Sequence, residues 1–416
     1  MYASRFVRIG LLVAAFIAAP ALARAQDASA QALQQEVERL RGQVDALQSR
    51  LAALETKLGA APQEAAAPAE PAPEPAAQAA LPATPDVGAA ASKVFNPDTS
   101  LIANFVGAAG KNPQSDLPSL NLSEVEAAFQ AVVDPYARAD FFLSAGPDGL
   151  EVEEGYVTFT SLPAGVLLKV GKMRAQFGKV NTMHTHVLPW ADRPLVLQNL
   201  LGGDEGLTDA GLSVSKLIPN SFMFIDATGE VYHGDSEVFH TDQRSRLNYV
   251  GHLRGYRDLT EGTNLDLGVS YTHGPTADLF GGTPDLNRQI TGIDATFRYR
   301  PLRRAIYKQF IGRTEVLWSK QDVPVGPQQH AFGFYGSADY QFAQRWFVGV
   351  RGDSSERAID ASLRDTGGSL ALTFRPSEFS LIRGQYRRTR YAEDVTANEF
   401  LFQFNFAIGA HGAHPF

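Results

Sequence analysis

The stretch 400–408 shows the clearest alternation of hydrophobic and polar positions in the chain. Large apolar residues occupy every second position, with mostly polar or small residues between them: Phe400, Phe402, Phe404, Phe406 and Ile408 alternate with Leu401, Gln403, Asn405 and Ala407. A period of two places alternate side chains on opposite faces of a β-strand. Residues 265–272, 293–300 and 332–342 repeat the pattern, and Phe416 ends the chain in the same parity as the phenylalanines. Strands that are apolar outside and polar inside predict an all-β fold, a transmembrane antiparallel β-barrel.

The connections between these stretches alternate between short and long. The short ones contain Pro or other turn residues and lie near positions 134, 163, 219, 260, 301, 344 and 376. The long ones cover residues 109–118, 177–206, 229–245, 274–288, 320–328 and 354–367, and two more, near Gly146 and Glu393, are brief. We therefore expect about sixteen strands within residues 96–416, with the short turns and both barrel ends in the periplasm.

A soluble all-β barrel is the alternative to this interpretation. It would place the apolar faces inside and would give no reason for aromatic residues at the strand ends. Tyr299, Trp318, Tyr340 and Trp346 lie near the ends of expected strands, where aromatic girdles form at the membrane interfaces. Their positions favour a barrel whose partner is outer-membrane lipid.

Residues 1–25 have the features of a secretory signal peptide. Arg5 and Arg8 precede an apolar run at 9–19, and Ala23-Arg24-Ala25 offers small residues for cleavage. No later apolar run is long enough for a membrane helix. We expect export to the cell outer membrane, with the N-terminal segment of the mature chain in the periplasm.

Residues 26–58 are expected to form a short coiled-coil helix. Leu or Val recurs at alternating spacings of four and three from Leu33 to Leu58, which is heptad spacing. Glu36 would face Arg41 of a neighbouring helix, so this flanking pair has opposite charges. A lone amphipathic helix against the barrel rim is the alternative. The seam favours a dimer, whereas porin-like barrels favour a trimer; we expect a homo-oligomer and favour the trimer.

Residues 59–95 consist mostly of Ala, Pro, Glu and Gln. Such a segment buries too little apolar surface to fold, so it is expected to be an extended linker. The helix before it would then be loosely tethered to the barrel. A stalk that contacts peptidoglycan is a second use for that helix, beside assembly.

The 416-residue chain has a formal net charge of -8, which becomes -11 without the three arginines of the signal peptide. An acidic protein is a poor candidate for nucleic-acid binding. The sequence contains no cysteine, which excludes disulfides, thiolate metal sites and cysteine nucleophiles. It has no Gly-rich phosphate loop, no zinc-enzyme spacing and no nucleophile motif around any serine. We expect no enzyme and no cofactor; an outer-membrane hydrolase is the weaker alternative.

Several short motifs carry a resemblance to a known family. They are Phe95-Asn96-Pro97-Asp98, Glu153-Glu154-Gly155-Tyr156, Leu162-Pro163-Ala164-Gly165, Phe177-Gly178-Lys179-Val180-Asn181, His184-Thr185-His186 and the ending Gly409-Ala410-His411-Gly412-Ala413-His414-Pro415-Phe416. In these motifs residues 95–416 resemble porin-like Gram-negative outer-membrane proteins often labelled zinc-regulated TonB-dependent outer membrane receptor. The resemblance implies a barrel. A TonB-dependent receptor also has a folded plug domain, whereas only the coiled coil and linker precede the barrel here, so we expect no plug.

The longest expected loop, 177–206, is the candidate constriction of the pore. In sixteen-stranded porins the loop at this place folds inward, and the resemblance in architecture suggests the same here. Pro189 and Pro194 would stiffen the loop, and Trp190 and the aliphatic residues of 195–201 would pack on the inner wall. An exposed loop has little reason to be so apolar. The alternative is a loop that lies over the mouth of the barrel.

Charged residues on this loop and on the facing wall would set ion preference. The loop offers His184, His186, Asp192, Asp204 and Glu205, and the expected pore wall offers Arg313, Glu315, Arg351, Arg383 and Arg387. Acidic groups facing arginines would produce a transverse field across the pore. The alternative is that lumen charges, which also include Glu124, Glu126 and Glu154, pair with one another and keep the lumen wet.

His184 and His186 are also candidate metal ligands. Two imidazoles separated by one residue can bind zinc when at least one further ligand is present. The alternative is that they are loop histidines without a role, like His411 and His414 near the chain end. Only a third ligand from elsewhere in the fold would favour the metal site.

The sequence as a whole favours an outer-membrane porin. We expect passive diffusion of small hydrophilic solutes or ions through an oligomer of barrels. A substrate-specific outer-membrane channel or receptor for an anion or a metal complex is the alternative.

Overall fold

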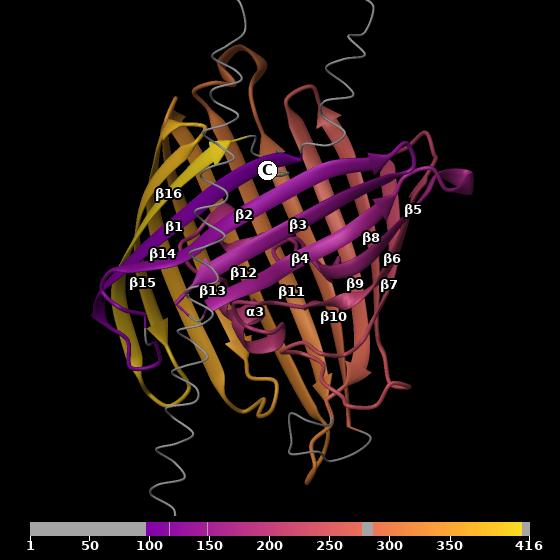
Figure 1. Cartoon of the computed structure of the whole chain (residues 1–416). Helices are drawn as coiled ribbons and strands as arrows, with labels where there is room; N and C mark the ends of the chain where they lie inside the picture. The colour runs from indigo at the N-terminus through magenta and orange to yellow at the C-terminus, as the bar shows by residue number, and fades with distance from the viewer. Residues whose placement is uncertain (1–96, 116, 148, 277–285, 410–416) are drawn as a thin grey trace, which may run out of the picture. The chain divides into compact units, whose positions relative to one another are not determined.

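The computed structural model describes residues 97–409, except 116, 148 and 277–285. The expected signal peptide, coiled coil and linker lie outside the described residues, as does Phe416. The described part is a closed barrel in which each strand pairs with its sequence neighbours and β1 closes the ring against β16 (Figure 1). The predicted all-β antiparallel barrel of sixteen strands is confirmed.

The strands alternate in direction around the ring and are nine to fifteen residues long. They are β1 (Asp98–Lys111), β2 (Asn121–Asp134), β3 (Ala137–Gly146), β4 (Gly149–Phe159), β5 (Val166–Arg174), β6 (Thr208–Ile218), β7 (Phe224–Tyr232), β8 (Asn248–Thr260), β9 (Thr263–Pro275), β10 (Asn287–Tyr299), β11 (Gln309–Gln321), β12 (Gln329–Ala343), β13 (Trp346–Glu356), β14 (Arg364–Ser377), β15 (Ser380–Arg390) and β16 (Thr396–Gly409).

The turns at one end of the barrel fall where Pro and other turn residues predicted them. Pro135, Pro163, Pro219 and Pro301 all lie between strands, because proline cannot donate a ladder hydrogen bond. At the other end the connections are longer, and the longest joins β5 to β6. We call the two ends the short-turn end and the long-loop end. The described residues include no helix that is long and apolar enough to cross a membrane.

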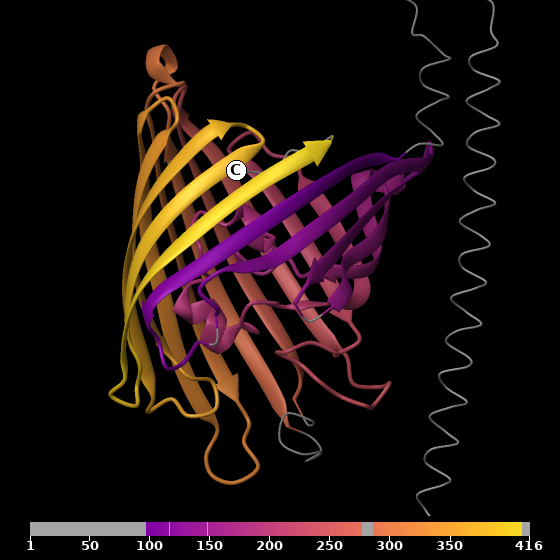
Figure 2. The same cartoon turned by 60° about the vertical axis from the view of Figure 1, so that its left-hand side comes forward.

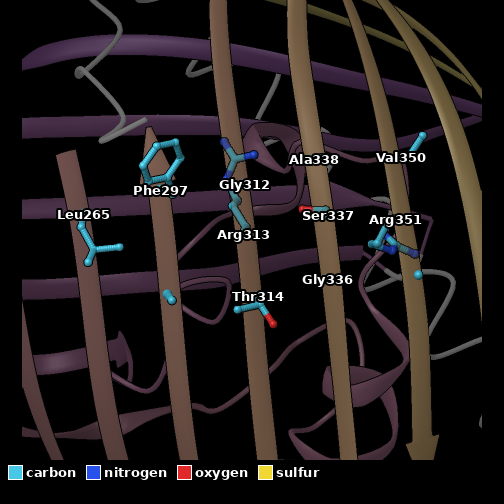
Figure 3. Close-up of a pocket in the computed structure, with 12 residues that line it drawn as sticks. Leu265, Phe297, Gly312, Arg313, Thr314, Gly336, Ser337, Ala338, Val350 and Arg351 are labelled. Carbon is cyan, nitrogen blue, oxygen red and sulfur yellow. The ribbon is translucent and has the colours of Figure 1, made fainter. Parts of the chain in front are cut away.

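The outer face of the barrel is apolar, as the alternation predicted. On β16 the side chain of Phe400 is 50% exposed while that of Leu401 is 1% exposed. Trp318, Tyr340 and Trp346 are also exposed on the outside. A shallow outer depression of about 680 Å³ lies over β9 to β13 (Figure 3). It is flanked by outward side chains such as Val350, so it belongs to the apolar outer surface and not to the lumen.

The inner face is in part more apolar than the mostly polar or small residues that the alternation predicted. Near the long-loop end, the inward residues Val250, Ile290, Leu317 and Tyr335 are apolar or aromatic and almost completely buried. They form one core with residues of the connection 175–207. Apolar side chains are stable there because chain, rather than water, covers them.

Candidate functional site: a loop folded into the barrel

The connection 175–207, here called the inner loop, is closed at its neck. The backbone N–H of Ala175 donates to the Leu207 carbonyl at 2.9 Å. The buried Asn181 side chain donates to both of these residues' carbonyl oxygens at 2.9 and 3.0 Å, and its own oxygen accepts from the Leu207 N–H at 2.8 Å. The Asn181 side-chain amide therefore bonds to both ends of the inner loop and fixes where the loop begins and ends.

The first turn of the inner loop runs close to the wall at β9 and β11. The Gly178 N–H donates to Ser270 Oγ at 2.9 Å, and the Val180 N–H donates to Glu315 Oε1 at 2.8 Å. Gly178 has a φ of 62°, and a Cβ on it would lie 2.2 Å from Glu315 Oε2. Glycine is therefore required here both for the backbone conformation and for the close approach.

The apolar segment of the inner loop lies against the inner wall. Its helix α3 (Leu195–Leu200) contacts β11 to β14, and both views of the barrel show α3 within the ring of strands (Figures 1 and 2). Val196, Leu197 and Leu200 of this helix are buried. Arg288 on β10 donates to the Leu200 carbonyl at 2.8 Å. That bond satisfies a carbonyl which the end of the helix leaves without an intrahelical partner.

Asp192 anchors the inner loop to β13 and β15. One carboxylate oxygen accepts from Arg351 Nη2 at 2.8 Å and from Arg387 Nη1 at 2.9 Å, and the other accepts from Gln385 Nε2 at 2.5 Å. Burial alone would raise the pKa of Asp192, but Arg351 and Arg387 outweigh burial and lower that pKa to about 2. Asp192 is therefore a buried, ionised residue that links the inner loop to the wall through hydrogen bonds.

Aromatic and main-chain contacts extend this anchor. The Arg351 guanidinium lies 4.9 Å from the centre of the Trp190 ring, and Trp190 meets Tyr335 edge-on at 5.3 Å. A guanidinium over an indole face is a favourable cation–π arrangement. Arg383 on β15 donates to the Leu188 carbonyl at 3.1 Å. The arginines of this wall thus bind the loop itself.

His184 anchors the inner loop to another part of the wall, at β2 and β4. Its Nδ1 lies 2.5 Å from Glu126 Oε2, and its Nε2 lies 2.6 Å from Glu154 Oε1. Burial would lower the pKa of His184, but its hydrogen bonds to Glu126 and Glu154 raise that pKa to about 10. Two residues later, the His186 carbonyl accepts from Asn405 Nδ2 at 2.8 Å. This anchor therefore joins a basic loop group to an acidic wall.

The other predicted site residues are placed as follows. Asp204 and Glu205 are exposed near the neck, and Asp204 accepts from Gln198 Nε2 at 2.6 Å. Partial desolvation beside the neck and the nearby Glu151 carboxylate raise the pKa of Glu205. Arg313 pairs with Asp339 on the neighbouring strand at 2.7 Å. The Glu205 main-chain carbonyl accepts from Arg174 Nη1 of β5 at 2.7 Å, but among the described residues neither carboxylate pairs with Arg313, Arg351, Arg383 or Arg387.

The charge arrangement differs from the expected field across an open gap. Asp192 touches Arg351 and Arg387 directly, and Glu315 accepts hydrogen bonds from the loop backbone and from Tyr335. The physical reason is that an unpaired charge in a dry part of the lumen would be costly. The loop brings its charge into contact with the wall, so these groups hold the loop in place.

The sequence reasoning missed the acidic partners of the histidines. Glu126 and Glu154 were assigned to the inner face, but nothing connected them to a loop thirty or more residues away. Glu153 was missed because strict alternation places it on the opposite face from Glu154. The pairing of β3 with β4 explains why Glu153 nevertheless faces inward. Phe142 pairs with Glu154 and Leu143 pairs with Val152, which leaves Glu153 as the extra residue of a β-bulge. Both glutamates are buried.

Comparison with known proteins gives one relative and a set of similar folds. No family model matches the chain. An uncharacterised protein of Aquifex aeolicus (strain VF5) is 31% identical in an alignment that covers 79% of this chain and 82% of that protein. The relative's own function is not described, so it groups the chain without assigning an activity.

Solved structures show where the fold occurs. A loop-deletion mutant of the outer membrane protein OmpT of Vibrio cholerae superposes with a TM-score of 0.52 at 10% identity, over 75% of this chain and 99% of that one. OmpF of Salmonella typhi gives 0.50 at 9% identity, over 75% and 97%. The anion-selective porin of Comamonas acidovorans gives 0.48 at 11%, over 75% and 97%. The OmpT and OmpF superpositions show that the closed barrel is a fold of outer-membrane proteins.

Proposed function

This chain belongs to the same family as the uncharacterised Aquifex aeolicus protein, and we propose that it is an outer-membrane channel for passive diffusion of small hydrophilic solutes or ions. The observation that carries the proposal is a closed barrel with an apolar outside and a charged inner wall, into which the inner loop folds. Lipid would cover the outer face and water would fill what remains of the lumen. The N-terminal segment would lie in the periplasm.

The inner loop supports a narrow channel. It bonds to β2 and β4 through His184, to β16 through His186, to β13 and β15 through Asp192, and to β10 through Leu200. These strands lie on several sides of the ring. Solutes would have to pass beside a segment that is fixed at many points, which favours ions and small molecules over large ones.

A substrate-specific channel or receptor for an anion or a metal complex is the second candidate. It is favoured by one cluster in the lumen, where Lys179, Arg254 and Arg298 lie within 3.6, 2.7 and 4.0 Å of Asp266. Three cations around one carboxylate attract anions, although Asp294 lies close enough to offset part of this charge. The receptor label carried by the sequence resemblance would further require an energising partner.

Reconstitution of the purified protein in a planar lipid bilayer separates these proposals. A passive channel gives steady single-channel currents without any partner protein, and the current rises in proportion to salt. A specific channel gives a current that one solute saturates or blocks. Absence of conductance would contradict both channel proposals and favour the receptor. The matched comparison is a chain lacking residues 186–200, in which we expect larger currents.

Assembly as a homo-oligomer, with a trimer favoured, is part of the proposal. It is supported by the heptad pattern of residues 33–58. Changing Leu40 and Leu47 to Asp should reduce the mass measured by light scattering in detergent without altering the barrel's circular dichroism. An unchanged mass would favour the stalk alternative, which co-sedimentation with peptidoglycan sacculi then tests.

A further inference from the structure

Six acidic and imidazole side chains from three separate segments meet on the inner wall. Two come from β2, two from β4 and two from the inner loop: Glu124, Glu126, Glu153, Glu154, His184 and His186. All six residues are less than 10% exposed. A buried group of this kind, with nitrogen and oxygen donors converging from distant parts of the chain, is the composition that transition-metal sites require.

The two wall strands depart from regular pairing beside this group. On β4 the extra residue of the bulge is Glu153, so that consecutive glutamates are both buried. On β2 the register shifts next to Glu124, where Ser123 is the extra residue and donates to the Asn104 carbonyl at 2.9 Å. Bulges re-aim side chains and are common next to functional sites. Two of them bring these carboxylates together.

The donor atoms are close to the spacing that one metal ion imposes. The donors of Glu126, His184 and His186 all lie within 4.8 Å of one another. Glu126 Oε2 is 3.7 Å from His186 Nδ1, and Glu153 Oε2 is 3.6 Å from His184 Nδ1. Ligands about 2.0–2.2 Å from a tetrahedral ion lie about 3.4 Å apart. The 2.5 Å contact between His184 and Glu126 would have to lengthen by about 1 Å.

We propose that Glu126, His184 and His186 bind one divalent transition-metal ion, with Glu153 as the fourth ligand. The imidazole nitrogens and carboxylate oxygens suit Zn²⁺ and its neighbours, whereas Ca²⁺ and Mg²⁺ bind through oxygen alone. The ion joins the inner loop to both wall strands at once. This site does not depend on which solute the barrel conducts.

The surroundings of the site also match a bound cation. Glu154 lies 2.6 Å from His184 Nε2, which is the arrangement in which a carboxylate orients a metal-bound histidine through its other ring nitrogen. Arg174 pairs with Glu153. The buried Arg193 also lies close enough to Glu153 to interact with its charge. Four carboxylates against these two guanidiniums leave a formal excess of two negative charges when both imidazoles are neutral, which a divalent ion offsets.

Several carboxylate oxygens in the group are also available to a ligand. Glu124 Oε2, Glu126 Oε1 and Glu153 Oε2 are buried and have no hydrogen-bond partner among the described residues. Leaving buried polar atoms without a partner is costly, so such atoms require an explanation. As the fourth ligand, Glu153 Oε2 would gain the partner that it lacks, whereas a proton shared by His184 with Glu126 and Glu154 leaves all three of these oxygens without one.

The test uses the full-length protein without a polyhistidine tag, with His411 and His414 changed to Ala to remove the terminal histidines. The protein is stripped with EDTA and titrated with Co²⁺, followed by visible absorption, and with Zn²⁺, followed by calorimetry and elemental analysis. We expect one ion per chain and the intense visible bands of four-coordinate cobalt. Glu154→Gln, which alters only the group behind His184, should weaken binding about 10–100-fold, and His186→Ala should weaken it more.

The matched control is His240→Ala. His240 also lies near a carboxylate, Asp235 at 3.0 Å, but belongs to the connection between β7 and β8 and not to the six-residue group. This variant should bind the metal as the parent does. Binding of less than one ion per chain by the parent would overturn the proposal whether or not any variant folds. Equal metal affinity in the parent and in a folded His186→Ala variant would also overturn the proposal. His184 would then link the loop to the wall only through its hydrogen bonds to Glu126 and Glu154.

Discussion

The two anchors of the inner loop use opposite chemistry. At β2 and β4 the loop supplies the base, His184, and the wall supplies the acids. At β13 and β15 the loop supplies the acid, Asp192, and the wall supplies Arg351 and Arg387. Each anchor is buried and hydrogen-bonded to more than one strand. The loop is therefore positioned by complementary charge on two sides of the barrel, in addition to its apolar contacts.

The difference between the anchors lies in how completely their charges are matched. Asp192 is surrounded by two arginines and an amide, and these arginines also pair with Asp353 and Glu399. The histidine anchor has four carboxylates, and three of them have an oxygen without a hydrogen-bond partner among the described residues. In the absence of other ions, the Asp192 anchor is therefore expected to stabilise the loop more than the His184 anchor does. The carboxylates of the His184 anchor can still bind a cation.

The largest expected effect comes from Asp192→Ala. Removing the carboxylate leaves Arg351 and Arg387 buried with one partner fewer each, and breaking a buried pair costs about 3–5 kcal/mol. The loss should appear as release of the inner loop, since the barrel ladder is untouched. We expect faster proteolysis within residues 175–207 and a larger single-channel conductance. Asp204→Ala, an exposed acid on the same loop, should stay within about 0.5 kcal/mol of the parent.

Acid should weaken the same anchor to a smaller extent. The pKa of Asp192 is lowered from 3.8 to about 2 in the folded chain, so its contribution is complete above pH 3.8 and is lost as the pH falls towards 2. The difference corresponds to about 2 kcal/mol. Conductance should be steady between pH 7 and 5 and should rise between pH 4 and 2. If Asp192→Asn shows the same acid-induced rise, another carboxylate, such as Asp353 or Glu399, is responsible.

The smallest expected effect comes from His184→Gln. The amide can still donate to one of the two glutamates, so about one charge-assisted hydrogen bond is lost, worth about 1.5–3 kcal/mol before the new contact is counted. Hydrogen exchange should increase around residues 182–188 and remain unchanged around Asp192. An equal increase at both anchors would show that the loop is released as one unit and that the two anchors are not separable.

Much of the barrel could be predicted from sequence because its signals are local. Alternation requires only neighbouring residues, and Pro135 or Pro301 marks a turn wherever a ladder hydrogen bond would be lost. The inward fold of the inner loop was also suggested by its apolar residues, such as Trp190 and Leu197. These features follow from short-range sequence and from burial.

The partners within the lumen could not be predicted in the same way. Whether Asp192 meets Arg351 depends on the path of a thirty-residue loop, and the sequence does not encode that path locally. The bulge at Glu153 shifts the faces of β4 by one residue, which alternation cannot anticipate. Leu317 and Ile290 lie on the inner face by parity, but only the folded loop explains why apolar residues are stable there.

The most direct test of the account is a disulfide between the inner loop and the wall. A Cβ at Gly333 on β12 would lie 2.8 Å from Val196 Cγ2 and 2.7 Å from Ser355 Oγ, so a cysteine there requires the Ser355 hydroxyl to turn away and is then within reach of a cysteine at position 196. The chain contains no cysteine, so Val196→Cys with Gly333→Cys gives one defined pair. A control pair, Val196→Cys with Gly336→Cys, places the second cysteine on the outer face of the same strand, where a Cβ meets nothing within 4 Å.

The decisive measurement is single-channel conductance of the Val196→Cys, Gly333→Cys protein before and after oxidation, alone and combined with Asp192→Ala. We expect the disulfide to form in this pair and not in the control. Oxidation should leave the conductance of the pair unchanged and return the enlarged conductance of the Asp192→Ala combination to the parent value. A disulfide that fails to form, or that closes a previously wide channel in the pair alone, would contradict a loop held inside the barrel.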